Sequence, residues 1–125
     1  MVPGAAGCTP EETSVPILTT ISPKEAADLI QSNRDNPAFV IIDVRTPEEF
    51  AGEHIANAVN IDYYAESFKD KISALDKNKT YLVYCLSGSR SRNALKMMAE
   101  MGFREVYDIS GGIAAWKSEG LPIVK

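Results

Sequence analysis

The chain has 125 residues, of which 45% are hydrophobic and 24% are charged, and its formal net charge at pH 7 is −4. This length and composition are typical of one soluble globular domain and exclude wholesale disorder. The acidic balance gives no basis for nucleic-acid binding, and no apolar run reaches the roughly 18 residues of a membrane span. Two cysteines and one histidine argue against a disulfide framework and a four-ligand zinc site.

The first 20 residues differ from the rest of the chain. Glycines and prolines interrupt them without sustained hydrophobic periodicity, so we predict a flexible tail over residues 1–20 and one domain over residues 21–125. Thr9-Pro10-Glu11-Glu12 resembles a helix start but lacks the apolar run that should follow. A basic segment followed by an apolar one is missing, so we expect no signal peptide.

Cys8 leaves two interpretations of the compartment open. Ala5-Ala6-Gly7-Cys8 resembles the end of a bacterial lipoprotein signal, in which a cysteine after a small residue is lipidated. The residue three positions before Cys8 is Ala rather than Leu, and the upstream hydrophobic stretch is missing, which favours an incidental cysteine. The default is therefore a cytoplasmic protein, and the alternative is an exported, lipid-anchored form.

Two capping boxes predict two helix starts. Ser22-Pro23-Lys24-Glu25 and Thr46-Pro47-Glu48-Glu49 each place Pro at the first helical position and Glu three residues after the cap. The second helix is expected to be short and to run through residue 50. Between the two boxes, Phe39–Ile42 is a continuous apolar run that ends at Asp43, as is typical of a buried parallel strand.

The second half of the chain continues this alternation of strands and helices. Ala94, Met98 and Met101 recur on one face of a helix, and Gly102 follows where the helix should end. The expected elements are a brief strand over 59–61, a weak helix over 70–75, a buried strand over 81–84, a helix over about 90–101, a strand over 105–109 and a last helix opened by Gly111-Gly112. The order predicts an α/β fold with a central, mainly parallel sheet flanked by helices on both faces.

Cys85 follows a predicted buried strand and precedes a short Gly-containing loop and a helix. Ligands in open α/β sheets bind beyond the carboxyl ends of the strands. The next helix points its unpaired N–H groups toward the loop, and the N–H groups of residues 86–90 can form an anion nest. Both effects stabilise a thiolate, so we predict a nucleophilic Cys85. The alternative, a buried core cysteine, fits less well with a strand end before a polar loop.

Two other loop residues suit an anion. Gly88 fits a turn that needs a positive φ or a close backbone approach. Arg90, five residues after Cys85, provides a fixed positive charge and a bidentate fork for an oxyanion.

Several motifs occur together in a characteristic order. They are Asp43-Val44-Arg45, Pro47-Glu48-Glu49-Phe50, His54-Ile55, Tyr84-Cys85-Leu86-Ser87-Gly88-Ser89-Arg90-Ser91, Gly111-Gly112-Ile113-Ala114-Ala115-Trp116 and Gly120-Leu121-Pro122. With this order over residues 21–125, the chain resembles the single-domain rhodanese, or thiosulfate sulfurtransferase-like, family. The resemblance implies a rhodanese-like fold and a sulfurtransferase that needs no cofactor and no metal.

The resemblance also implies a reaction and its residues. Cys85 would be the catalytic nucleophile: it would take sulfur from a sulfane donor such as thiosulfate, carry it as a persulfide and pass it to cyanide or a thiol. Arg90 would help to position the anionic donor. The substrate-binding residues implied in this way are Leu86, Ser87, Gly88, Ser89 and Arg90.

Two alternatives belong to other functional classes. The same fold could act as a persulfide carrier or docking module that moves sulfur between partner proteins with little small-molecule turnover. The phosphatase-like branch of the superfamily, with some arsenate reductases, uses Cys-x5-Arg, but here Ser91 occupies the position that would need Arg. Arg92 lies about 200° from Arg90 on a helix and does not restore the longer pattern.

The remaining candidate residues are expected to be structural. His54 is the only histidine, and the matching position in the resembling family is not a catalytic base. Asp43 and Arg45 are expected to form an ion pair that holds neighbouring segments together. Trp116 and the methionines of the long helix are expected to pack in the core.

Overall fold

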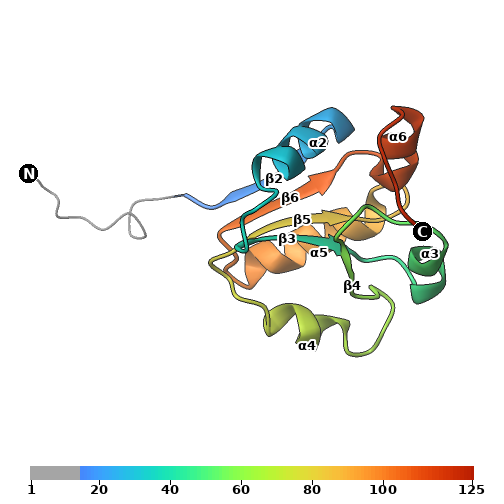
Figure 1. Ribbon diagram of the computed structural model, residues 1–125. Coiled ribbons are helices and arrows are strands. Elements are labelled where there is room, and N and C mark those ends of the chain that lie inside the picture. The colour runs from blue at the N-terminus through green and yellow to red at the C-terminus, as the bar shows by residue number, and fades with distance from the viewer. Residues whose placement is uncertain (1–14) are drawn as a thin grey trace, which may run out of the picture.

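A five-stranded sheet with order β2-β6-β5-β3-β4 runs through the computed structural model, which describes residues 15–125 (Figure 1). Every pair of neighbouring strands is parallel, which confirms the predicted sheet. The strands are β2 (Ile17–Ile21), β3 (Phe39–Asp43), β4 (Val59–Asn60), β5 (Thr80–Tyr84) and β6 (Glu105–Ile109).

The first two helices begin at the predicted capping boxes, whereas the third begins two residues before the expected range of 70–75. Ser22 and Glu25 form the first capping box, and Thr46 and Glu49 form the second. The side chain at each cap accepts an otherwise unpaired backbone N–H of the first turn, which stabilises a helix by about 1 kcal/mol. The helices are α2 (Pro23–Ser32), α3 (Pro47–Gly52), α4 (Phe68–Ser73), α5 (Ser89–Glu100) and α6 (Gly112–Ser118).

Alternating side chains of β5 supply two hydrophobic cores, one on each face of the sheet. Leu82 and Tyr84 pack on the face covered by α2 and α6, with Trp116 among their neighbours. Tyr81 and Val83 pack on the opposite face, which α4 and α5 cover. Figure 1 shows these two helix pairs on opposite sides of the sheet. Burial on both faces explains why the strand reads as a continuous apolar run.

Strand β2 corrects the predicted boundary of the flexible tail. Residues 17–20, predicted to belong to the tail, pair with β6 in parallel, from Ile17 beside Glu105 to Ile21 beside Ile109. The strand lies at the edge of the sheet and most of its side chains are exposed or half-buried, so it carries no core pattern. Residues 1–14 of the predicted tail, including Cys8 and the segment Thr9–Glu12, lie outside the described residues.

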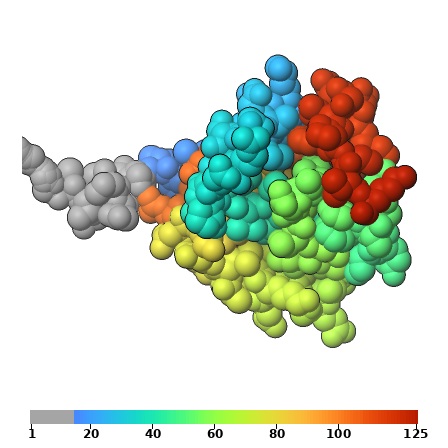
Figure 2. Space-filling model, viewed as in Figure 1, coloured from blue at the N-terminus to red at the C-terminus, as the bar shows by residue number. Residues whose placement is uncertain are grey.

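The C-terminal residues close over the segment that follows α3. The backbones of His54 and Val124 exchange two hydrogen bonds of 2.8 Å. The indole N–H of Trp116 donates to the carbonyl oxygen of Pro122 at 2.8 Å. Figure 2 shows this last, red part of the chain packed beside the green part that precedes β4. Over residues 15–125, none of the helices has the length and apolar character needed to cross a bilayer.

Candidate active site

Cys85 directly follows β5, and its side chain is only 1% exposed. Its Sγ accepts hydrogen bonds from the backbone N–H groups of Gly88, at 3.1 Å, and Ser91, at 3.4 Å. Ser91 lies in the first turn of α5, so the sulfur is at the positive end of a 12-residue helix. The Cys85 sulfur therefore faces two backbone N–H donors and the positive end of the α5 dipole, and its nucleophilic role stays a prediction.

Gly88 lets the loop fold back on the sulfur. Its φ is 110°, a conformation that residues with a side chain rarely adopt. A Cβ at this position would lie 3.5 Å from the backbone nitrogen of Gly111, so the loop also runs close to the start of α6. Of the two reasons that the sequence gives for a glycine, only the positive φ applies at Gly88, because 3.5 Å is an ordinary van der Waals contact that a side chain could make.

Helix α6 supports the loop through backbone hydrogen bonds. The N–H groups of Ile113 and Ala114 donate to the carbonyl oxygens of Cys85 and Leu86, at 2.9 and 3.1 Å. A Cβ on Gly112 would lie only 2.4 to 2.5 Å from these two carbonyl oxygens. The close approach explains the glycine at position 112, because only glycine lets α6 begin against the loop.

Arg90 is held by an acidic side chain from another helix. Its guanidinium donates to the two carboxylate oxygens of Glu49 at 3.0 and 3.3 Å and lies 5.4 Å from the ring centroid of Tyr64. Its hydrogen bond to Glu49 is the main cause that lowers the pKa of Glu49 to about 2. The pKa of Arg90 is raised, mainly by its hydrogen bond to Glu49.

The remaining predicted loop residues are exposed to solvent. Leu86 is 45% exposed, and Ser87 is exposed as well. Ser89 is the first residue of α5 and is also exposed. These three residues can therefore meet a molecule that approaches the buried sulfur from solvent.

A chain of polar side chains links the sulfur to the sheet through Ser91. The Ser91 Oγ lies 3.5 Å from the Cys85 Sγ, 3.3 Å from the Gly88 carbonyl oxygen and 3.3 Å from the Asp108 Oδ2. Ser91 and Asp108 are both fully buried. The Thr20 hydroxyl donates to the Asp108 Oδ1 at 2.5 Å. Sequence reasoning missed Asp108 and Thr20, which reach the site only through the sheet.

Asp43 and Arg45 form the expected ion pair beside the site. Their closest contact is 2.8 Å, and both are buried. Arg45 also donates to the carbonyl oxygen of Glu53 at 2.6 Å, while the side-chain amide of Asn60 donates to the carbonyl oxygens of Asp43 and Arg45. The pair therefore joins the end of β3 to α3 and β4. Burial is the main cause that raises the pKa of the neighbouring Tyr84.

The contacts of His54 fit the structural role that we expected. Its Nδ1 lies 2.9 Å from the carbonyl oxygen of Phe50, and the two rings stack with centroids 3.9 Å apart. Trp116 and Met98 are buried in the cores, as predicted. In the described part of the chain, no cluster of three His, Cys, Asp or Glu residues could hold a metal ion.

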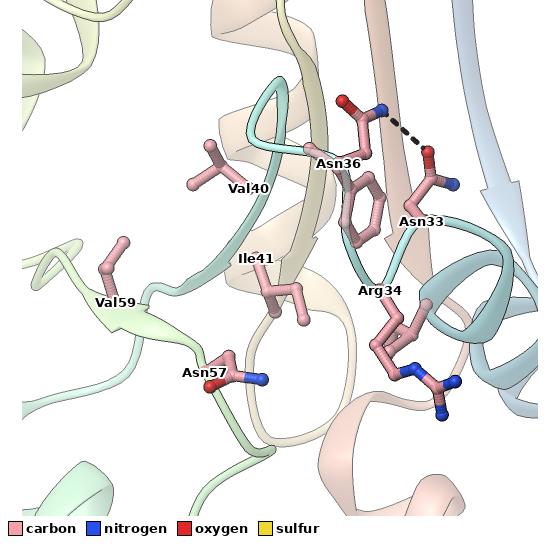
Figure 3. A pocket seen from close by; sticks show the side chains of 9 residues that line it. Asn33, Arg34, Asn36, Val40, Ile41, Asn57 and Val59 are labelled. Atoms are coloured by element: carbon pink, nitrogen blue, oxygen red, sulfur yellow. Dashed lines mark hydrogen bonds between the residues drawn. The ribbon is translucent and has the colours of Figure 1, made fainter.

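A cavity of about 420 Å³ lies away from the cysteine loop. Figure 3 shows its lining, in which the side-chain amide of Asn36 donates to Asn33 at 3.0 Å. It is bordered by the end of α2, the start of β3 and the segment around Asn57, and includes no residue of 85–91. Cys85 instead follows the carboxyl end of β5, so this cavity is not part of the cysteine site.

Comparison with known proteins gives consistent matches. The model of the rhodanese-like domain family matches residues 22–119. Thiosulfate sulfurtransferase GlpE of Coxiella burnetii is 38% identical over 98 residues, which cover 78% of this chain and 86% of that protein. An uncharacterized protein of Synechocystis is 38% identical over 106 residues, or 85% of this chain, and the chain spans only 56% of that protein. The crystal structure of a rhodanese-related protein from Thermoplasma volcanium superposes with a TM-score of 0.67 at 32% identity, covering 88% of this chain and 98% of that one.

Proposed function

The chain belongs to the rhodanese-like domain family, a sulfurtransferase family, and from this membership we propose that it transfers sulfane sulfur through a persulfide on Cys85. The donor is a small anion such as thiosulfate, and the acceptor is cyanide or a thiol. The name of the Coxiella relative supports thiosulfate as the donor. The observation that carries the proposal is the buried Cys85 sulfur, which accepts backbone N–H groups at the start of α5.

The proposed cycle has two displacements on sulfur. The Cys85 thiolate attacks the outer sulfur of thiosulfate; a new S–S bond forms, the old S–S bond breaks, and sulfite leaves with the bonding electron pair. Cyanide then attacks the terminal sulfur of the persulfide. Thiocyanate forms, the S–S bond to Cys85 breaks, and its electron pair returns to the cysteine as a thiolate. Because sulfite takes the electron pair of the first broken S–S bond and Cys85 takes that of the second, no external oxidant or reductant is needed.

The loop has a defined part in this cycle. The backbone N–H groups of the segment Leu86–Arg90, together with that of Ser91, stabilise the negative sulfur before and after each transfer. Arg90 attracts the anionic donor by its charge while its guanidinium stays bonded to Glu49. The burial of Cys85 restricts its reaction to small sulfur compounds or to chains that can reach into the loop.

A carrier role is the second candidate, and the rim of the site favours it. Leu86 is 45% exposed and Tyr64 is 68% exposed, and Tyr64 lies beside Arg90. Exposed apolar and aromatic side chains of this kind are suited to contact with another protein. In this role the persulfide would come from one protein and go to another.

Intact-mass spectrometry tests the proposal. The protein is incubated with thiosulfate and then with cyanide, as wild type, as Cys85→Ser and as Cys8→Ser, which removes the other cysteine. We expect a gain of one sulfur atom that requires Cys85, is unaffected by Cys8→Ser and disappears with cyanide. Sulfur that loads but resists cyanide and small thiols would instead support the carrier role. Failure to load from thiosulfate and from other sulfane donors would contradict both.

A further inference from the structure

We propose that Asp108 is a positioning residue for Cys85: it holds the Ser91 hydroxyl proton, so that Ser91 presents an oxygen lone pair rather than a proton to the sulfur. This role rests on the proposed function of Cys85 as the nucleophile. It concerns a buried acidic side chain that the sulfur-transfer cycle above does not use.

The Ser91 hydroxyl has more neighbours than it has protons. Three groups surround the Ser91 Oγ at hydrogen-bond distance: the Asp108 Oδ2 at 3.3 Å, the Gly88 carbonyl oxygen at 3.3 Å and the Cys85 Sγ at 3.5 Å. A serine hydroxyl has one proton to donate and accepts with its lone pairs. Only one of the three neighbours can therefore receive this proton as a full hydrogen bond.

The other partners of each neighbour decide which one receives the proton. The Gly88 carbonyl oxygen already accepts the backbone N–H of Arg92 at 3.0 Å. The Cys85 sulfur already accepts the N–H groups of Gly88 and Ser91. The Asp108 Oδ2 has the Ser91 hydroxyl as its hydrogen-bond partner. Leaving a fully buried carboxylate oxygen without a donor costs more than leaving either of the others with one donor fewer.

Thr20 fixes the orientation of the carboxylate. Its hydroxyl donates to the Asp108 Oδ1 at 2.5 Å, and the two residues are direct neighbours in the pairing of β2 with β6. With Oδ1 engaged by Thr20, Oδ2 is directed at Ser91. The edge strand β2 thereby contributes to the cysteine site through Asp108.

This arrangement limits how strongly the loop stabilises the thiolate. Two backbone N–H groups donate to the sulfur, while the hydroxyl that could be a third donor is held by Asp108. A thiolate that is stabilised further forms more readily but becomes a weaker nucleophile. Asp108 thus keeps the thiolate, once it has formed, a stronger nucleophile than a third donor would leave it.

Asp108→Asn tests this role because it replaces a carboxylate oxygen, which accepts from Ser91, with an amide group that can donate to Ser91. Thr20 still donates to the Oδ1 of the new side chain, so the amide group faces Ser91 and donates to its oxygen. The Ser91 proton is then free to reach the sulfur. The thiolate fraction is read from ultraviolet absorbance at one fixed pH, in a Cys8→Ser background, as the difference from the matching Cys85→Ser protein. We expect the thiolate-to-thiol ratio to rise roughly threefold to tenfold, the range for one added hydrogen bond of ordinary net strength.

A matched control is available on the same strand. Glu105 accepts the hydroxyls of Thr80 and Tyr107, at 3.2 and 2.5 Å, and begins β6 at the end opposite to Asp108. Glu105→Gln makes the same chemical change and should leave the thiolate ratio as in wild type. In a Ser91→Ala background, Asp108→Asn should lose its effect, since the effect passes through the Ser91 hydroxyl.

Three results would overturn the role of Asp108. They are an unchanged or lower thiolate ratio in Asp108→Asn, an equal rise in Glu105→Gln, and a rise that persists in the Ser91→Ala background. Ser91→Ala alone gives a second test should Asp108→Asn not fold. If the Ser91 hydroxyl accepts from the thiol, its removal must not lower the thiolate-to-thiol ratio. If it instead donates to the thiolate, its removal would lower this ratio.

This test is separable from that of the proposed function. The thiolate ratio is measured without a sulfur donor, so a wild-type protein that fails to load sulfur can still show the coupling of Asp108, Ser91 and Cys85. Conversely, normal sulfur loading with no such coupling would reject the role of Asp108 and leave the sulfurtransferase proposal intact. In addition, at a pH high enough for Cys85 to be thiolate in both proteins, we expect the Asp108→Asn protein to show a lower kcat with an unchanged KM for thiosulfate, because its thiolate is the weaker nucleophile and the donor site is not altered.

Discussion

Glu49 joins helix α3 to helix α5 through two parallel hydrogen bonds to Arg90, at 3.0 and 3.3 Å. The same carboxylate also completes the capping box of α3, because its Oε1 accepts the backbone N–H of Thr46 at 3.0 Å. One side chain thus stabilises the start of α3 and fixes the arginine next to the cysteine loop. The two residues are 41 positions apart in the chain, so this link depends on the fold.

Loss of the Glu49 charge should make stability less dependent on pH in the acid range. The pKa of Glu49 is lowered to about 2, mainly by Arg90, so its contribution to folding is complete above its ordinary value of 4.5 and is lost as the pH falls toward 2. We expect Glu49→Gln to lower the free energy of unfolding by about 1 to 2 kcal/mol near neutral pH. This expected loss is smaller than the full pKa shift of Glu49 would imply, because the Glu49 side chain is 30% exposed and solvent screens its ion pair with Arg90.

Urea unfolding at a series of pH values measures this effect. The difference between wild type and Glu49→Gln should be constant above about pH 5 and shrink steadily below it, as the wild-type carboxylate takes up a proton. Glu48→Gln, at the exposed neighbouring position, is the matched control and should change stability little. A constant difference down to pH 2 would show that the ion pair does not stabilise the fold.

Arg90→Ala should impair the use of anionic donors more than that of uncharged ones. Its positive charge attracts thiosulfate in the proposed cycle, so we expect the KM for thiosulfate to rise about tenfold, with a smaller effect on an uncharged organic persulfide or polysulfide. Steady-state kinetics with both donor classes measure the difference.

Two further variants separate the charge of Arg90 from its geometry. Arg90→Lys keeps the positive charge but loses the fork that bonds both oxygens of Glu49, so it should recover part of the KM effect. Arg92→Ala removes an exposed arginine from the same helix and should leave the KM close to that of wild type. An equal loss with charged and uncharged donors in Arg90→Ala would mean that Arg90 only supports the loop.

The features that local sequence determines could be predicted. The capping boxes at Ser22 and Thr46 lie within four consecutive residues each, and the position of Cys85 follows from the apolar run before it. Strand β2 could not be recognised in this way, because an edge strand with few buried side chains is defined mainly by its hydrogen bonds to β6.

The missed part of the site has the same physical origin. Thr20, Asp108 and Ser91 come from β2, β6 and α5, and only strand pairing and helix packing bring them together. Asp108 has one sequence signal, a charged residue near the end of a strand with apolar buried neighbours. Without the position of Ser91, that signal does not indicate which group the carboxylate meets. In the sequence, the capping box alone accounts for Glu49, so nothing there indicates that Glu49 also pairs with Arg90.

Gly112→Ala should disrupt the cysteine loop, because the loop backbone leaves no room for a methyl group at this position. The added Cβ would lie 2.4 and 2.5 Å from the carbonyl oxygens of Leu86 and Cys85, both backbone atoms, and the φ of 62° adds strain. The loop must move away from α6, which breaks its hydrogen bonds from Ile113 and Ala114. We expect a loss of at least about 2 kcal/mol in unfolding free energy, together with loss of sulfur loading on Cys85.

Gly102→Ala is the matched control for this variant. Gly102 also has a positive φ, of 90°, but no heavy atom lies within 4 Å of the position that its Cβ would take. Its substitution should cost only the backbone strain, about 1 kcal/mol, and should leave sulfur loading intact because Gly102 follows the far end of α5. Thermal unfolding and intact-mass spectrometry of both variants make the comparison. If both variants lose stability equally and both retain loading, the contact between α6 and the loop does not hold Cys85 in place.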